Sequence, residues 1–277
     1  MAAVSHLGVL RSRAGARAFQ LTRRAPSPDL APGVERHWIV RWDLEGREPY
    51  PQETLPHPCV NLVIDAGKSG VFGVGTRKFE VLLEGRGQVV GVKFKPGAFH
   101  PFLRRPVSEL TDRMLPLDDV FGGGGAELER AVLEGEDDAR QIALIEAYLR
   151  PHLPAPDEQV TAVLRVIERA LADREITTVE ELAARSRVPE RTLQRMFRKY
   201  VGVSPKWVIQ RFRLHEAVAR AEEGVMVDWA SLAHDLGYFE QLALSLAHQT
   251  GALITVIADA GVAHHDLYAV KRAGTAY

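Results

Sequence analysis

The sequence contains a single cysteine, Cys59, among its 277 residues. One cysteine excludes an intramolecular disulfide and any metal site built from a cysteine cluster. The chain also lacks a run of about 18 apolar residues, the length that a membrane-spanning helix requires. It has no apolar segment of the kind that secretory signal peptides carry. We therefore expect a cytoplasmic protein that does not interact with a membrane.

The chain shows no overall excess of charge of either sign, and its formal net charge is −1. The charge is nevertheless distributed unevenly. Residues 160–220 contain 13 Lys and Arg against 7 Asp and Glu, whereas residues 221–277 contain 2 against 7. Binding to a nucleic acid requires a local basic surface, whatever the total charge. Residues 160–220 are therefore the part of the chain in which such a surface is expected.

Residues 177–200 are predicted to form two short helices joined by a tight turn. Thr178 and Glu181 have the spacing of a capping box, which predicts the start of the first helix. Pro189 suits the first turn of the second helix because it has no N–H group to leave unpaired. In the second helix, apolar and polar side chains separate at helical spacing. The apolar face carries Leu193, Met196, Phe197 and Tyr200, and the opposite face carries Arg191, Gln194, Arg195 and Arg198.

This arrangement predicts a helix-turn-helix whose second helix lies in the major groove of DNA. Arg and Gln carry donors that match the edges of guanine and adenine. We therefore predict that Arg191, Gln194 and Arg195 contact bases. Arg198 and Lys199 are predicted to contact phosphates. The alternative is an ordinary amphipathic surface helix whose charges are solvated.

The segment that follows, residues 201–224, resembles the AraC/XylS family of bacterial transcription regulators, in which a Gly-x-Ser-Pro turn opens a long linker helix. The matching residues are Gly202, Ser204, Pro205, Arg211, Arg213, Leu214 and Ala217. Residues 182–183 and 193–197 also match the family pattern. The resemblance implies an all-α domain with two helix-turn-helix units, joined by the linker helix, that read adjacent segments of the major groove. Arg211 is then a candidate DNA contact, either to a phosphate or, as the alternative, paired with an acid.

The residues before this domain have the pattern of a β-rich fold. Short candidate strands at 34–42, 60–65, 71–74, 79–83 and 89–94 are punctuated by glycines and lack intervening helices. This predicts a small β-barrel or sandwich. Helices are expected at 108–115, 126–134 and 138–150, and another is expected after Asp157, which suits an N-cap. Residues 55–63, 84–87 and 91–97 resemble a poorly characterised sensor-like domain that precedes the DNA-binding half of many AraC-type regulators.

The predicted fold class is therefore α+β, with a small β-barrel or sandwich followed by an all-α helix-turn-helix domain. Residues 1–20 are predicted to be a disordered extension and 21–121 a β-rich sensor or dimerisation domain. Residues 122–156 are predicted to be a helical connector, 157–241 the AraC-type domain, and 242–277 a tail. No ligand site is predicted. No cofactor and no metal are expected, because the ligand set that a metal would need beside His57, Cys59 and His100 is not visible.

The tail departs from the family pattern. Residues 227–241 fit the start of a second helix-turn-helix. The basic reading helix that should follow is not recognisable, since no Arg or Lys lies between Arg220 and Lys271. A frameshift near codon 242 would preserve everything before it and scramble everything after it. Alternatively, the tail is genuine and covers the domain as an apolar cap.

Taken together, the residues and the resemblance predict a non-enzymatic, sequence-specific transcription regulator of the AraC type. Its partner is double-stranded promoter DNA, and activation would add a contact with RNA polymerase. The N-terminal domain is expected to sense a small-molecule effector or to form a homodimer. The alternative is a sensor or dimerising protein that does not bind DNA because its second helix-turn-helix is damaged.

Overall fold

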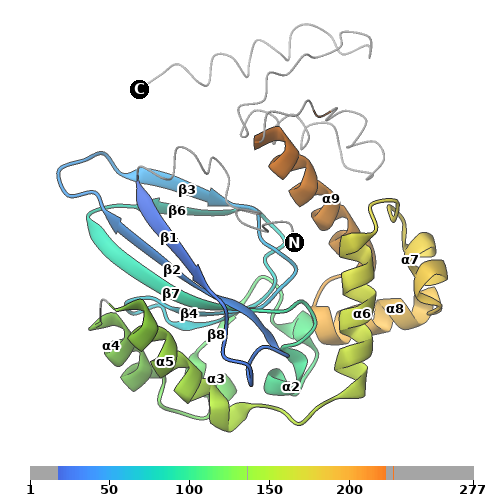
Figure 1. The fold of residues 1–277 in the computed structure, drawn as a ribbon, viewed down its shortest axis with the longest axis horizontal. Helices are drawn as coiled ribbons and strands as arrows, with labels where there is room; N and C mark the ends of the chain where they lie inside the picture. Colours follow the sequence, from blue (N-terminus) through green and yellow to red (C-terminus); the bar gives the residue numbers. More distant parts are fainter. Residues whose placement is uncertain (1–17, 136, 223–226, 228–277) are drawn as a thin grey trace, which may run out of the picture.

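The computed structural model describes residues 18–135, 137–222 and 227 (Figure 1). A sheet region, residues 18–153, comes first, and a helical region, residues 158–222, follows it. The predicted α+β class is confirmed to the extent that a sheet region precedes a helical region. Two hydrophobic cores support the two regions, one under the larger sheet and one among the C-terminal helices.

The strands of the sheet region form two antiparallel sheets. The larger has six strands in the order β1-β2-β7-β4-β5-β8, and the smaller pairs β3 with β6. Among the described strands neither sheet closes on itself, so a barrel is not seen. The strands are β1 (Phe19–Arg24), β2 (Val34–Asp43), β3 (Tyr50–Thr54), β4 (Asn61–Ile64), β5 (Gly70–Phe72), β6 (Phe79–Leu83), β7 (Arg86–Phe94) and β8 (Met114–Leu115).

The central strands β2 and β7 show why this sequence forms a sheet. Their side chains alternate between two faces, as a strand requires. Ile39 of β2 is buried in the core on the face that the helices cover. On the other face Trp38 and Trp42 lie against Gly91 and Gly87 of β7, where any Cβ atom would overlap the indole rings. The two glycines are therefore required by close approach of the tryptophans.

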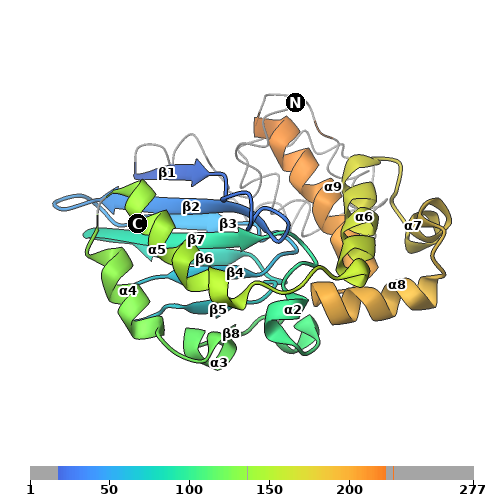
Figure 2. The same cartoon turned by 60° about the horizontal axis from the view of Figure 1, so that its bottom comes forward.

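Helices cover one face of the larger sheet. Figure 2 shows α4 and α5 side by side along this face, with α3 and α2 towards the helical region. Asp137 caps α5, because its side chain accepts a hydrogen bond from the Arg140 N–H. The helical segments are α2 (His100–Leu103), η1 (Val107–Glu109), α3 (Leu117–Phe121), α4 (Gly125–Leu133), α5 (Asp138–Leu149) and η2 (Arg150–His152).

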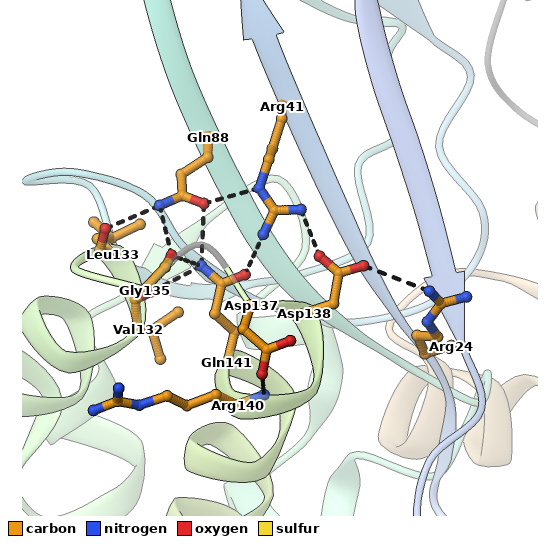
Figure 3. Close-up of polar contacts among 10 residues, drawn as sticks. All are labelled: Arg24, Arg41, Gln88, Val132, Leu133, Gly135, Asp137, Asp138, Arg140 and Gln141. Atoms are coloured by element: carbon orange, nitrogen blue, oxygen red, sulfur yellow. Dashed lines mark hydrogen bonds and ion pairs between the residues drawn. The ribbon is translucent and has the colours of Figure 1, made fainter.

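A polar network joins α4 and α5 to the sheet (Figure 3). Gln141 of α5 is fully buried, and its amide donates to the carbonyls of Val132 at 2.8 Å and Gly135 at 2.6 Å. Arg41 of β2 donates to the Gln141 carbonyl oxygen at 2.7 Å and pairs with Asp138. Buried polar groups are costly unless they are hydrogen-bonded. This network therefore fixes the position of the helical layer on the sheet.

The helical region contains α6 (Glu158–Ala172), α7 (Val179–Ser186), α8 (Glu190–Met196), the π-helical turn η3 (Phe197–Val201) and α9 (Pro205–Glu222). Asp157 caps α6 as expected, since its side chain accepts from the N–H groups of Gln159 and Val160. The expected helices at 126–134 and 138–150 correspond to α4 and α5. In both figures α8 lies beside α2, at the junction of the two regions.

Two details differ from the sequence-based expectations. The prediction of a helix at 108–115 was wrong. The chain forms the short turn η1 there, followed by Asp112 in the left-handed conformation with φ 56° and then by strand β8. Strand β8 pairs with β5, so a sheet contact overrides the local helical pattern. Strand β1 begins at Phe19, inside the segment that we assigned to an N-terminal extension.

Candidate nucleic-acid interface

Helices α7 and α8 form the two-helix unit that the sequence indicates. Thr178 and Glu181 form the complete capping box at the start of α7. The helix ends at Arg187, which adopts the left-handed conformation with φ 54°. The Val188 N–H then donates to the Ala183 carbonyl at 3.1 Å, which closes the turn before α8. Pro189 is the N-cap of α8, one residue earlier than expected.

The two faces of α8 and η3 separate as the helical spacing predicts. Leu193 and Phe197 are fully buried, and Tyr200 is 4% exposed. The Tyr200 hydroxyl donates to Gln159 of α6 at 2.5 Å, which fixes the end of the segment against its neighbour. The residues on the opposite face are all exposed: Arg191, Gln194, Arg195, Arg198 and Lys199.

The five exposed residues keep their charges and donors available. Within the described part of the chain none of the five pairs with a carboxylate. By contrast, Arg185 of α7 is held by Asp173 and Glu175, and its pKa is raised by these hydrogen bonds. The set of five, which we call the α8 basic face, can therefore donate hydrogen bonds to a ligand without first breaking an ion pair.

Arg211 does not belong to this face. Its side chain is on α9, is 5% exposed and donates to the Thr76 carbonyl of the sheet region at 2.9 Å. Its guanidinium lies 4.4 Å from the centre of the Trp207 ring, a cation–π distance. A duplex cannot reach a guanidinium buried in this way. In this arrangement Arg211 joins the two regions, which disfavours the phosphate contact that was one of the two roles predicted for it.

The neighbouring Arg213 pairs with an acid of its own helix. It lies 3.3 Å from Glu216 and also donates to the carbonyl of Ala170 on α6. Burial lowers its pKa, and the nearby positive charge of Arg174 lowers it further, although Glu216 acts in the opposite direction. Arg213 therefore fixes α9 to α6.

The end of the α8 basic face is held by the sheet region. The Thr111 hydroxyl donates to the Gly202 carbonyl at 2.7 Å, directly after η3. The His100 ring of α2 lies 4.5 Å from the Tyr200 ring. Burial lowers the pKa of His100, and the positive charge of Lys199 lowers it further. These contacts join residues about 90–100 positions apart, and no local sequence pattern predicts them.

A second contact between the regions involves two histidines. His215 of α9 stacks on His57, with ring centres 3.9 Å apart and planes 10° apart. Its Nε2 lies 3.3 Å from the Pro56 carbonyl. Burial lowers the pKa of His215 to about 3, and the charge of Arg211 acts in the same direction. His215 is therefore neutral at physiological pH.

The other candidates within the described residues are a metal site, a reactive cysteine and a membrane-spanning helix. Within the described residues, no group of three or more His, Cys, Asp or Glu side chains is placed to hold a metal ion. Cys59 is buried, and burial raises the pKa of its thiol, so its reactive thiolate form is disfavoured. No described helix combines the length and the apolar character that crossing a bilayer requires.

A hollow of about 500 Å³ lies between the end of β1 and α5. Its carboxylates already have partners: Asp138 pairs with Arg41, and Glu146 accepts hydrogen bonds from Ser27 and lies 3.0 Å from the buried His37 Nε2. These groups hold the helix on the sheet, so they do not point to a ligand. The second helix-turn-helix expected at 227–241 and the tail at 242–277 lie outside the described residues, apart from Val227.

A family described as a domain of unknown function, DUF6597, matches residues 22–116, which covers most of the sheet region. No curated protein matches the chain. Two solved structures of ToxT from Vibrio cholerae are similar over most of their length. An apo lysine-to-alanine variant shows 10% identity and a TM-score of 0.31, covering 86% of this chain and 96% of its own. A second ToxT structure shows 10% identity and a TM-score of 0.26, covering 85% and 94%. At such scores the likeness carries no argument about fold or function.

Proposed function

We propose that the protein is a sequence-specific regulator of transcription of the AraC type that binds double-stranded DNA through the α8 basic face. The sheet region senses a small-molecule effector or forms a homodimer, and activation adds a contact with RNA polymerase. The protein acts in the cytoplasm and catalyses no reaction. The residues that resemble the AraC/XylS family, from 182 to 217, support this proposal.

One observation carries the proposal: α8 and η3 expose Arg191, Gln194 and Arg195, with Arg198 and Lys199. In the same segment Leu193, Phe197 and Tyr200 are buried and Met196 is half-buried. A ligand that meets this face meets four cations and one amide. A helix of this size fits the major groove, which is about 12 Å wide, and Arg and Gln match the donor and acceptor patterns of guanine and adenine. We assign base contacts to the first three residues and phosphate contacts to the last two.

The test starts from selection of a preferred duplex out of a randomised pool, followed by binding titrations at several salt concentrations. Arg195→Ala is expected to reduce the preference for the selected duplex over a random one by about 5- to 150-fold, the equivalent of about 1–3 kcal/mol. Lys199→Ala is expected to weaken both duplexes equally and to reduce the salt slope by about one phosphate contact.

Two control variants sharpen the comparison. Arg140→Ala removes an exposed arginine from α5, on the far side of the sheet region, and should leave both the affinity and the salt slope unchanged. Arg211→Met removes the buried guanidinium and should leave the salt slope unchanged, although it lowers stability. If Arg195→Ala and Lys199→Ala changed binding in the same way, the division into base and phosphate contacts would be refuted.

The alternative is a sensor or dimerising protein that does not bind DNA. The absence of Arg and Lys between Arg220 and Lys271 favours it, because a second reading helix would need such residues. Loss of one of two reading helices removes several base contacts of about 1–3 kcal/mol each, which weakens binding by orders of magnitude. A protein that selects no duplex and shows no salt-dependent binding would establish this alternative.

A further inference from the structure

The α8 basic face does not end at the last residue of η3. The segment from α2 to η1 in the sheet region carries two consecutive arginines, Arg104 and Arg105, both exposed. Arg104 closes α2: it adopts a left-handed conformation with φ 56°, and its backbone N–H donates to the His100 carbonyl at 2.8 Å. We call these two residues the 104–105 pair.

The 104–105 pair is bracketed by two contacts to the end of the α8 basic face. On one side, His100 lies against Tyr200 with ring centres 4.5 Å apart. Arg104 follows His100 by one helical turn, which is about 6 Å along the axis. On the other side, a Cβ atom at Gly202 would lie 3.1 Å from Val107, so these backbones are in close contact. The segment that carries the pair is therefore held against η3, whose exposed residues are Arg198 and Lys199.

The local charge balance is positive. Arg104, Arg105, Arg198 and Lys199 carry four positive charges in two neighbouring segments. Arg105 lies 3.6 Å from Glu109, but both side chains are about half exposed, at 46% and 50%. Such surface pairs contribute only about 0–1 kcal/mol, so Arg105 can exchange Glu109 for a stronger anion.

The position of the pair is also fixed relative to α8. The Thr111–Gly202 hydrogen bond and the packing of Val163 and Ile167 against Gly97 connect the sheet region to the helices on either side of this segment. The 104–105 pair is therefore carried at a fixed position relative to the C-terminal end of the α8 basic face. Figures 1 and 2 both show α2 beside α8.

We propose that the 104–105 pair binds the phosphate backbone of duplex DNA next to the bases that α8 reads, so that the sheet region itself forms part of the DNA interface. This inference rests on the proposed function. When a helix lies in the major groove, phosphate strands run along both sides of it, and cations beside the helix neutralise them. Contacts of this kind supply affinity and orientation but carry no sequence information.

The experiment compares wild-type protein with the R104A/R105A variant on a selected and a random duplex, at several salt concentrations. The salt slope is expected to fall by about 1.8, because each neutralised phosphate contributes about 0.9. At 0.1 M salt this corresponds to a loss of affinity of about 60-fold for both duplexes, relative to a 1 M reference. The preference for the selected duplex should not change.

Further variants separate a charge effect from a folding effect. R105A alone leaves the left-handed position of Arg104 intact and should lower affinity by about 8-fold at 0.1 M salt, whereas R105K should retain the wild-type slope. The R47A/R140A variant is the matched control, because it removes two exposed arginines that lie elsewhere on the sheet region. All variants are compared by thermal melting to verify that they fold.

The outcomes are distinct. If wild-type protein binds the selected duplex but R104A/R105A behaves like R47A/R140A, the inference is overturned and the proposed function stands. If wild-type protein binds neither duplex, both fail. If R104A/R105A loses sequence preference as well as affinity, the pair reads bases, and its assignment to phosphates is overturned.

Discussion

Replacement of Gly202 by alanine tests the contact between the sheet region and the end of η3. Gly202 ends η3 with φ 98°, a left-handed conformation that residues with a Cβ atom rarely adopt. It is also enclosed: an added Cβ atom would lie 2.9 Å from the Thr111 Oγ1 and 3.1 Å from both the Cγ1 and the carbonyl oxygen of Val107. Two separate costs therefore arise, one from the backbone and one from the contact.

The backbone cost can be measured at a matched position. Gly122 ends α3 with φ 86°, and nothing lies within 4 Å of an added Cβ atom there. Gly122→Ala is expected to cost about 1 kcal/mol of unfolding free energy, the left-handed penalty less the gain from a stiffer unfolded chain. Gly202→Ala carries the same cost and adds about 1–3 kcal/mol because the Val107 backbone must move. The expected total is about 2–4 kcal/mol.

Chemical denaturation followed by circular dichroism gives both values. A double-mutant cycle with Thr111→Ala then locates the extra cost. Thr111→Ala alone removes the hydrogen bond to the Gly202 carbonyl, at a cost of about 1 kcal/mol. In the Gly202→Ala background this hydrogen bond is already disturbed, so the two costs should not add. Equal costs for Gly202→Ala and Gly122→Ala, or strict additivity in the cycle, would refute the contact.

Two further predictions concern the other contacts. His215 has a pKa lowered to about 3 in the folded protein against 6.5 as the ordinary value, so between these values the unfolded chain binds the extra proton. Stability should fall as the pH decreases below 6.5, by up to about 1.4 kcal/mol per pH unit. His215→Phe should show a shallower decline between pH 7.5 and 5.5, because the contribution of His215 is lost while those of other groups remain, among them His37 and His100, whose pKa values are also lowered. Gln141→Leu should cost about 2–4 kcal/mol, because buried groups left without a partner cost about 1–3 kcal/mol each. Gln20→Leu, on the exposed side of β1, should stay within about 0.5 kcal/mol in the same denaturation assay, and equal costs for the two leucine variants would contradict the role of the network.

Short-range signals made α7 and α8 predictable. The capping box of Thr178 and Glu181 depends on two residues three positions apart, and the two faces of α8 depend on helical spacing alone. Both are local properties, so the sequence contains them in full. The same reasoning placed β2, β4 and β6 within one or two residues, because β-branched and aromatic runs between glycines favour strands wherever they occur.

Features that depend on distant partners were not predictable in this way. The segment at 108–115 has a helical pattern, but pairing of Met114 and Leu115 with β5 makes its end a strand. On α6, Leu171 continues the helical spacing of the buried Ile167 but is 54% exposed, whereas Val166 and Ala170 are buried. The spacing was helical, but the partner surfaces determined which face is buried.

The role of Arg211 could not be predicted from the sequence for the same reason. An arginine on a helix that follows a helix-turn-helix is as compatible with a phosphate contact as with a structural one. The deciding atom is the carbonyl of Thr76, 135 positions earlier in the chain. Thr76 is itself held by Asp112, which accepts hydrogen bonds from its N–H at 2.7 Å and from its hydroxyl at 2.6 Å. No spacing rule connects these three residues.

The turn at Thr111 and Asp112 therefore contacts both the end of η3 and, through Thr76, helix α9. Thr111 holds the end of η3 through Gly202, and the adjacent Asp112 holds Thr76, which accepts the hydrogen bond from Arg211 of α9. The described polar contacts of Thr111, Arg211 and His215 with the opposite region contribute about 0.5–1.5 kcal/mol each, hence about 1.5–4.5 kcal/mol together. Coupling between an effector site and a second site is typically about 1–3 kcal/mol. If the sheet region binds an effector as proposed, a coupling of this size is comparable with the energy of the contacts that hold α8 and α9 against it.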